Sequence, residues 1–194
     1  MTRIISGFAG SLPLAVPRSG TRPTSDRVRE AIFSALESRG GLGGLRVLDL
    51  YAGSGALALE AVSRGAAEAV LVEKNAAAAG VARKNAGVLT AAATKAKLPF
   101  PRISVSSQAV LPYLRGTPVV AGAGFDVVFI DPPYELPDAE LTEALAALAP
   151  LLAPDATVLV ERSTRTPEPA WPTGLELDRT KAYGETALWW ASPV

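Results

Sequence analysis

The chain has 194 residues, of which 48% are hydrophobic and 20% charged, so it is expected to form one globular domain with a sizeable core. It contains no cysteine and no histidine. This excludes disulfides, thiolate zinc sites and a cysteine nucleophile, and it removes the commonest general base and metal ligand, so we expect no metal site. No apolar run is long enough to span a membrane and the first residues do not form a secretory signal, so we expect a cytoplasmic protein without membrane contact.

The net charge is zero, but the charges are unevenly distributed. Residues 74–102 carry six basic side chains and no acidic one, whereas residues 103–160 carry one base and seven acids. A basic face is typical of proteins that bind nucleic acid. Taken alone, however, this uneven distribution of charge is better explained by charged side chains on solvated loops.

The N-terminal third contains a predicted hairpin, a linker and a helix. Residues 3–16 alternate partly between apolar and polar, with Gly and Ser in the middle, which predicts a short hairpin. Residues 17–23 are predicted to be a linker. The segment 24–40 predicts a helix that Thr24 or Ser25 caps and Gly40 ends.

From residue 46 onward, strand and helix patterns alternate. Buried strands are predicted at 46–50, 68–74, 102–107, 125–130 and 156–162. Helices are predicted at 56–65 and 75–89, after the strand at 102–107 up to about residue 115, and at 138–152. A loop is predicted at 90–101 and an antiparallel hairpin at 175–191. This alternation predicts an α/β fold with a doubly wound parallel sheet, in which ligands bind beyond the carboxyl ends of the strands.

A glycine-rich turn follows the strand at 46–50 in the sequence LDLYAGSGALALE. Glycine permits unusual φ angles and close approach of the backbone to a ligand. Glu73 closes the next strand 18 positions after Gly55, where an acid binds ribose hydroxyls in nucleotide-binding folds. These features predict a cofactor that contains a nucleoside. Asp49 suits the ammonium group of S-adenosylmethionine, but this motif alone leaves a dinucleotide or a simple turn open.

The strand at 125–130 runs into the sequence Asp131-Pro132-Pro133-Tyr134. The prolines fix φ and hold the preceding residues extended. The Asp131 carboxylate and the Pro132 carbonyl can accept both N–H bonds of a planar amine, which draws its lone pair back to nitrogen for attack on a methyl group. Tyr134 can stack on a flipped base. A rigid turn with a surface tyrosine is the simpler alternative.

Together, LDLYAGSG, Glu73 and DPPY resemble the class I methyltransferases of exocyclic amino groups. The segments RPTSDRVREAIFSAL and YGETAL resemble more specifically the bacterial 16S rRNA (guanine-N2)-methyltransferase family. The resemblance implies a Rossmann-like, mostly parallel seven-stranded sheet with an antiparallel C-terminal hairpin. It divides the chain into an N-terminal hairpin extension with its linker (1–23) and a methyltransferase domain (24–194).

The resemblance also implies S-adenosylmethionine as donor and a guanine N2 in 16S rRNA as acceptor. The partner would be the 30S subunit or its assembly intermediate, and the enzyme a monomer. The implied catalytic residues are Asp131, Pro132, Pro133 and Tyr134. The implied cofactor-binding residues are Asp49, Tyr51, Ala52, Gly53, Ser54, Gly55, Glu73, Lys74, Ser107 and Gln108. The candidate RNA-binding residues are Arg3, Arg18, Arg22, Thr24, Arg27 and Arg29.

The sequence departs from the family at two places. Its N-terminal hairpin has fewer basic residues, and each candidate arginine is as well explained by a solvated or salt-bridged role. Gln108 stands where the family has an acid near the cofactor adenine, although its amide oxygen can still accept a hydrogen bond. The alternatives are a DNA adenine-N6 or protein glutamine-N5 methyltransferase, and a non-catalytic ribosome assembly factor on the same fold.

Overall fold

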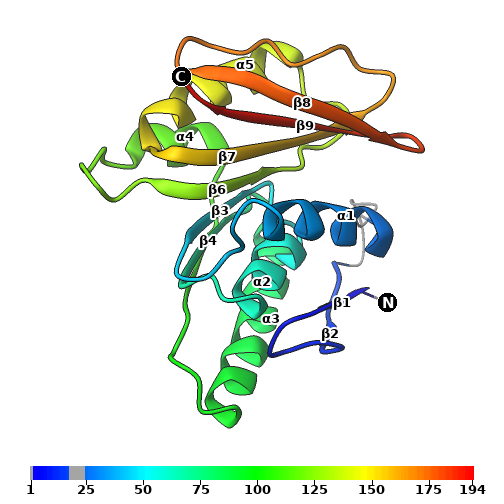
Figure 1. The fold of residues 1–194 in the computed structure, drawn as a ribbon, viewed down its shortest axis with the longest axis vertical. Helices are drawn as coiled ribbons and strands as arrows, with labels where there is room; N and C mark the ends of the chain where they lie inside the picture. The colour runs from blue at the N-terminus through cyan, green and yellow to red at the C-terminus, as the bar shows by residue number, and fades with distance from the viewer. Residues whose placement is uncertain (1, 18–24) are drawn as a thin grey trace.

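A seven-stranded sheet forms the centre of the protein in this computed structural model, which describes residues 2–17 and 25–194 (Figure 1). The strands are β1 (Thr2–Arg3), β2 (Pro13–Leu14), β3 (Arg46–Leu50), β4 (Glu68–Val72), β5 (Arg102–Ser106), β6 (Phe125–Ile130), β7 (Leu152–Ser163), β8 (Leu175–Tyr183) and β9 (Thr186–Pro193). The helices are α1 (Asp26–Glu37), α2 (Ala56–Ser63), α3 (Ala76–Lys95), α4 (Val110–Gly116) and α5 (Asp138–Leu148), followed by a short 3-10 turn (Ala149–Leu151).

The order of the large sheet is β5-β4-β3-β6-β7-β9-β8. The pairs from β5 to β7 are parallel, and β9 pairs antiparallel with both β7 and β8. β1 and β2 form a separate antiparallel pair. The expected α/β architecture, with a small N-terminal hairpin and an antiparallel C-terminal hairpin, is therefore confirmed. Among the described residues, no helix is long and apolar enough to cross a membrane.

Helices cover both faces of the sheet, which explains why its central strands are continuous apolar runs. Alternate residues contribute to two separate cores. Val47 and Phe129 pack in the core that includes α1, α2 and α3. Leu48 and Val128 pack in the core that includes α4 and α5.

The predicted end of one helix is wrong. Residues 90–95 continue helix α3 instead of beginning the predicted loop. The segment is rich in alanine, which has the highest helix propensity. Leu89 and Ala93 are also buried, and they extend by steps of three and four residues the face that Ala82 and Ala86 present to the core. The helical periodicity thus persists through the first half of the segment 90–101, which was predicted to be a loop.

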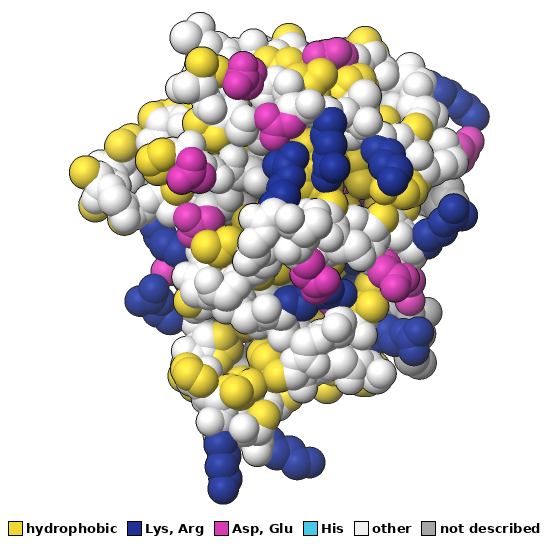
Figure 2. Space-filling view, viewed as in Figure 1, with side chains coloured by type: hydrophobic (Ala, Val, Ile, Leu, Met, Phe, Trp, Pro, Cys, Tyr) yellow, Lys and Arg dark blue, Asp and Glu magenta, His cyan; other side chains and the backbone are white. Residues whose placement is uncertain are grey.

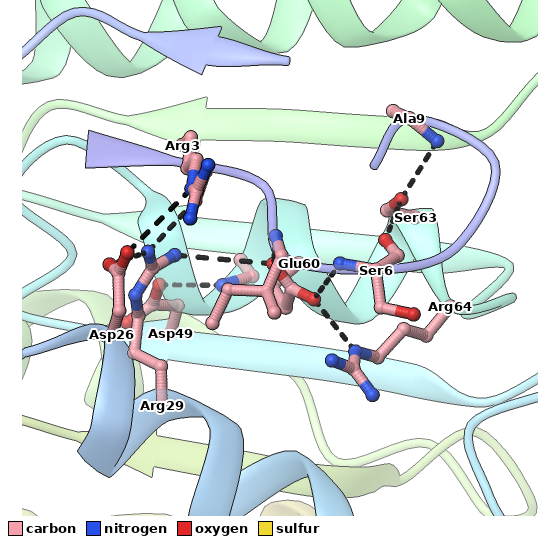
Figure 3. Close-up of polar contacts among 11 residues, drawn as sticks. Arg3, Ser6, Ala9, Asp26, Arg29, Asp49, Glu60, Ser63 and Arg64 are labelled. Atoms are coloured by element: carbon pink, nitrogen blue, oxygen red, sulfur yellow. Dashed lines mark hydrogen bonds and ion pairs between the residues drawn. The ribbon is translucent and has the colours of Figure 1, made fainter. Parts of the chain in front are cut away.

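The N-terminal hairpin is held against α2 by polar side chains that the chain buries completely (Figure 3). Glu60 is 0% exposed, and its two carboxylate oxygens accept the backbone N–H groups of Ile5 (2.6 Å) and Ser6 (2.9 Å). It also pairs with Arg64 at 2.7 Å and with Arg29 at 4.0 Å. Ser63 accepts from Ala9 N–H at 3.0 Å. The described part of the extension is therefore bound tightly to the main domain.

Replacing Glu60 with Ala should lower the free energy of unfolding by about 3–5 kcal/mol, because it leaves the N–H groups of Ile5 and Ser6 without their acceptor and removes the buried carboxylate that pairs with Arg64 and Arg29. Urea unfolding followed by tryptophan fluorescence measures the change. Glu37→Ala is the matched control: Glu37 pairs with the same Arg64, but its side chain is 55% exposed, so about 1 kcal/mol or less is expected. Equal losses in the two variants would contradict this role for Glu60.

Candidate active site

The loops that follow β3, β4, β5 and β6 emerge at one edge of the sheet because these strands end in register. Leu50 pairs with Val72 and with Ile130, and Val72 pairs with Ser106. The next residue of each strand therefore lies at the same edge. The expectation that the glycine-rich turn, Glu73, Ser107 and Asp131 lie along one edge is thus confirmed.

An open cavity of about 280 Å³ lies at this edge, close to the lower end of the usual range for ligand pockets. Of the predicted site residues, it brings together Tyr51, Gly53, Glu73, Lys74, Asp131, Pro132, Pro133 and Tyr134. Five residues that the sequence did not single out also line it: Pro17, Asn75, Ala78, Glu135 and Glu161. The glycine-rich turn, Glu73 and the DPPY loop thus share one cavity.

Six of the ten predicted cofactor residues do not line this cavity: Asp49, Ala52, Ser54, Gly55, Ser107 and Gln108. Of these, Ser107 and Gln108 are exposed. The Gln108 Nε2 donates to Ser106 Oγ at 2.8 Å, which leaves its amide oxygen as the acceptor for a ligand. Their contact with a cofactor adenine stays a prediction.

The turn after β3 has positive φ angles at Tyr51 (61°), Gly53 (55°) and Gly55 (79°). A Cβ on Gly55 would lie 2.4 Å from Leu71 Cδ2, so only glycine fits the close packing of the turn on β4. Gly53 has open space where a Cβ would stand, and its backbone lines the cavity. Ala52 lies within the same turn, where its carbonyl accepts the Gly55 N–H at 2.7 Å. The glycines thus let the backbone face the cavity directly.

Glu73 links this turn to the start of α3. Its Oε2 accepts Gly53 N–H at 2.9 Å and its Oε1 accepts Asn75 N–H at 2.7 Å. Asn75 in turn caps α3. Because a carboxylate has about four acceptor positions, these two bonds fix its orientation and leave capacity for the hydroxyls of a ribose.

Asp49, on β3 just before the glycine-rich turn, is 2% exposed and does not line the cavity. Burial raises the pKa of its carboxyl to about 8. A hydrogen bond from Ala58 N–H opposes this shift, and the charges of Asp131 and Glu73 add to it. A cation bound nearby would restore the ionised form. Asp49 therefore suits a ligand that carries an ammonium group.

Arg162 on β7 is a site residue that the sequence reasoning missed. It is 6% exposed, and its guanidinium donates to the Leu136 carbonyl (3.3 Å) and to Asp138 Oδ1 (2.9 Å). These bonds fix the segment after Tyr134 to the sheet and to the start of α5. The sequence feature that could have indicated Arg162 is the Glu-Arg pair at the carboxyl end of a mostly apolar strand.

Tyr51 lies close to the same Arg162. Burial raises the pKa of the Tyr51 hydroxyl to about 12; Glu140 raises it further, and Arg162 lowers it. Arg162 thus interacts electrostatically with Tyr51 in the turn after β3 and hydrogen-bonds to the loop after β6.

The candidate RNA-binding residues differ in their exposure and contacts. Arg18, Arg22 and Thr24 lie outside the described residues. Arg3 is 60% exposed in its side chain and forms an ion pair with Asp26 at 3.7 Å, and Arg27 is exposed.

The expectation that Arg29 contacts RNA is wrong. Its side chain is 1% exposed and donates to the Arg3 carbonyl (2.8 Å) and to Asp26 Oδ1 (2.7 Å), as Figure 3 shows. The salt-bridged alternative is correct for this residue.

Basic side chains on the face shown in Figure 2 are interspersed with acidic ones, and some project where α3 ends in Figure 1. Lys95 lies in the last turn of α3 and Lys97 follows it; both are exposed. Within residues 2–17 and 25–194, no group of three or more acidic side chains is placed to hold a metal ion.

The sheet order, the antiparallel β9, the acid after β4 and the DPPY loop after β6 define a Rossmann-like class I methyltransferase. An rRNA methyltransferase from Streptomyces viridochromogenes has this fold, with a TM-score of 0.71 at 18% identity over 91% of this chain and 88% of its own.

The sequence comparison is more specific. Residues 2–192 match the model of the family described as conserved hypothetical protein 95. Ribosomal RNA small subunit methyltransferase D of Escherichia coli is 36% identical over 95% of this chain and 86% of its own. A solved structure of a methyltransferase-like protein of Escherichia coli has a TM-score of 0.76 at 31% identity and covers 99% of this chain and 97% of its own. The chain therefore belongs to this family, and it is a relative of ribosomal RNA small subunit methyltransferase D.

The raised pKa of Asp49 predicts a pH-dependent stability. Between the ordinary aspartate pKa of about 4 and a pKa of about 8, the folded carboxyl is protonated and the unfolded one is ionised. The folded state binds the extra proton, so stability falls as pH rises through this window, by up to about 1.4 kcal/mol per pH unit.

Asp49→Asn keeps an oxygen for Ala58 N–H and removes this titration. We expect the variant to be more stable than the wild type at about pH 8–9 and similar to it near pH 4. Urea unfolding at several pH values measures both proteins. A difference that does not change with pH would contradict the raised pKa.

Proposed function

We propose that the protein transfers a methyl group from S-adenosylmethionine to the exocyclic N2 of a guanine in 16S rRNA, within the small ribosomal subunit or an assembly intermediate. We further propose that it acts as a cytoplasmic monomer. The observation that carries the proposal is that Glu73 and the segment from Asp131 to Tyr134 line one cavity. The name of the Escherichia coli relative supports rRNA as the substrate class.

The residues present fit a nucleoside cofactor with an amino-acid tail. Glu73 is oriented by Gly53 and Asn75 and retains acceptors for ribose hydroxyls, and Asp49 offers a buried acid for an ammonium group. The backbone of Gly53 and the side chains of Lys74 and Ala78 complete this part of the wall. When bound, S-adenosylmethionine supplies an electrophilic methyl group on its sulfonium.

The DPPY loop would hold the amine for attack. Asp131 and the Pro132 carbonyl accept the two N–H bonds of the amine and direct its lone pair toward the cofactor side of the cavity. Pro132 is buried, which fixes the carbonyl, and the Leu136 N–H bonds to the Pro133 carbonyl at 3.0 Å to form a turn. Position and electrostatics supply most of the catalysis, and the amine loses its proton after transfer.

Tyr134 is 62% exposed at the rim of the cavity. An exposed aromatic side chain can stack on an unpaired base and contribute roughly 1–3 kcal/mol to its binding. Exposed Arg3, Arg27, Lys95 and Lys97 would contact the phosphate backbone around the base, with Arg18, Arg22 and Thr24 as further candidates from the sequence.

Transfer of labelled methyl groups tests the proposed substrate class. The protein is incubated with labelled S-adenosylmethionine and small subunits from cells that lack the gene, and in parallel with DNA and with a protein pool. We expect label only in 16S rRNA, as N2-methylguanine at one mapped nucleotide. Label confined to DNA or to protein would overturn the proposal in favour of the adenine-N6 or glutamine-N5 alternative.

Asp131→Ala should abolish methyl transfer and leave the cofactor dissociation constant within about threefold of wild type, because Asp131 acts on the amine. Asp126→Ala is the matched control. Asp126 lies near the opposite end of β6, where it accepts the Arg46 N–H at 2.7 Å, so transfer should persist. Normal turnover by Asp131→Ala would exclude the role proposed for Asp131, and absence of transfer in the wild type would support the non-catalytic alternative.

Glu73→Ala should weaken cofactor binding by about 10- to 100-fold, as expected for losing charge-assisted hydrogen bonds of about 1.5–3 kcal/mol. Titration calorimetry with S-adenosylmethionine measures the affinity. Glu68→Ala changes an acid at the other end of β4, which pairs with Arg46 and Arg102, and should bind normally. Unchanged affinity in Glu73→Ala would refute the assignment.

A further inference from the structure

Glu161 lies beside Asp131 at the carboxyl end of the sheet. Ile130 of β6 pairs with Val160 of β7 in parallel register, so the next residue of each strand is Asp131 and Glu161. Neighbouring parallel strands are about 4.8 Å apart, and residues at matching positions face the same side of the sheet. The two acids are therefore adjacent at the proposed methyl-transfer site.

Two cavities meet at these residues. The 280 Å³ cavity and a smaller one of about 10 Å³ share four lining residues: Asp131, Pro132, Tyr134 and Glu161. Three of them already have proposed roles in holding the amine and the base. Glu161 is the fourth member of this group, and it comes from a different strand, so the DPPY motif could not reveal it.

The charge of the larger cavity favours a ligand edge that is rich in N–H donors. Among the residues that the structure describes, four acidic ones line the cavity, Glu73, Asp131, Glu135 and Glu161, against one basic residue, Lys74. The Watson–Crick edge of guanine carries two N–H bonds on N2 and one on the neighbouring N1. Adenine and cytosine carry an acceptor at the ring nitrogen beside their amine, and its lone pair would face a carboxylate unfavourably.

We propose that Glu161 selects guanine as the target base by accepting the N1 hydrogen while Asp131 and the Pro132 carbonyl hold the N2 amine. The inference rests on the proposed function and adds the group that recognises the base. Two neighbouring residues at the end of β7 would then have different roles. Glu161 reads the base, and the next residue, Arg162, anchors the loop through Leu136 and Asp138. A site built to hydrogen-bond an N–H group discriminates against analogues that lack it.

The test compares two bases at the mapped target nucleotide. Small subunits are reconstituted with 16S rRNA that carries either guanine or 2,6-diaminopurine there; the analogue retains the 2-amino group but has an acceptor at N1. The readout is kcat/KM for methylation of the 2-amino group by the wild type and by Glu161→Gln. The glutamine amide can donate to the analogue's N1. We therefore expect the ratio of kcat/KM for guanine to kcat/KM for the analogue to be at least tenfold lower in Glu161→Gln than in the wild type.

Two further variants control for general damage. Glu161→Asp keeps the carboxylate and should slow both substrates without narrowing the preference. Glu176→Gln makes the same chemical change at an exposed position on β8 and should behave as wild type. Thermal unfolding of each variant shows that it is folded.

The outcomes separate the inference from the proposed function. If Glu161→Gln slows both substrates equally, or keeps the wild-type preference, the role of Glu161 is overturned while guanine methylation stands. If the wild type does not methylate guanine N2 at all, the proposed function itself fails. A narrowed preference in Glu161→Gln, with none in Glu161→Asp, supports the inference.

Discussion

The parallel register of β3 with β4 and β6 is the constraint on which the site depends. It ends the strands together, so that the residue after each one opens onto the same edge. A shift of one residue in β6 would move Asp131 to the other face of the sheet, because side chains alternate along a strand. The two apolar cores oppose such a shift, since each takes every second residue of the strand. Core packing thus aligns the polar groups of the site.

The site gathers acidic groups at a cost to stability. Asp49, Glu73, Asp131 and Glu161 all lie at the carboxyl edge, and burial together with the charges of two of its neighbours keeps the Asp49 carboxyl protonated near neutral pH. A fold selected for stability alone would not bury an acid beside other acids. Partial compensation comes from two backbone N–H groups: that of Gly53 in the turn donates to Glu73, and that of Ala58 in the first turn of α2 donates to Asp49. The arrangement is favourable when a cation and N–H donors enter the cavity.

The sequence predicted the strands, the crossover pattern and the edge at which the motifs meet, because these depend on local periodicity and on glycine and proline chemistry. It failed where the deciding information is tertiary. Residues 90–95 contain no large apolar side chain that would mark a core-facing helix, yet Ala93 is buried and the helix continues. Arg29 has the sequence context of a surface arginine, yet its side chain is buried, pairs with the exposed Asp26 and lies 4.0 Å from Glu60. Glu161 and Arg162 reach the site only because β7 lies beside β6, a pairing between strands separated by a helix.

The N-terminal hairpin is connected to the glycine-rich turn through one buried side chain. Asn85 on α3 is 2% exposed, and its amide accepts the Ala15 N–H and donates to the carbonyls of Ala15 and Ser54, each at 2.9 Å. Ser54 lies in the turn whose Gly53 N–H bonds to Glu73. The same amide therefore holds the end of the hairpin and the backbone of the turn. With Glu60 fixing the start of the hairpin, the described part of the extension is attached at both ends, and Asn85 couples its end to the turn whose Gly53 lines the cavity.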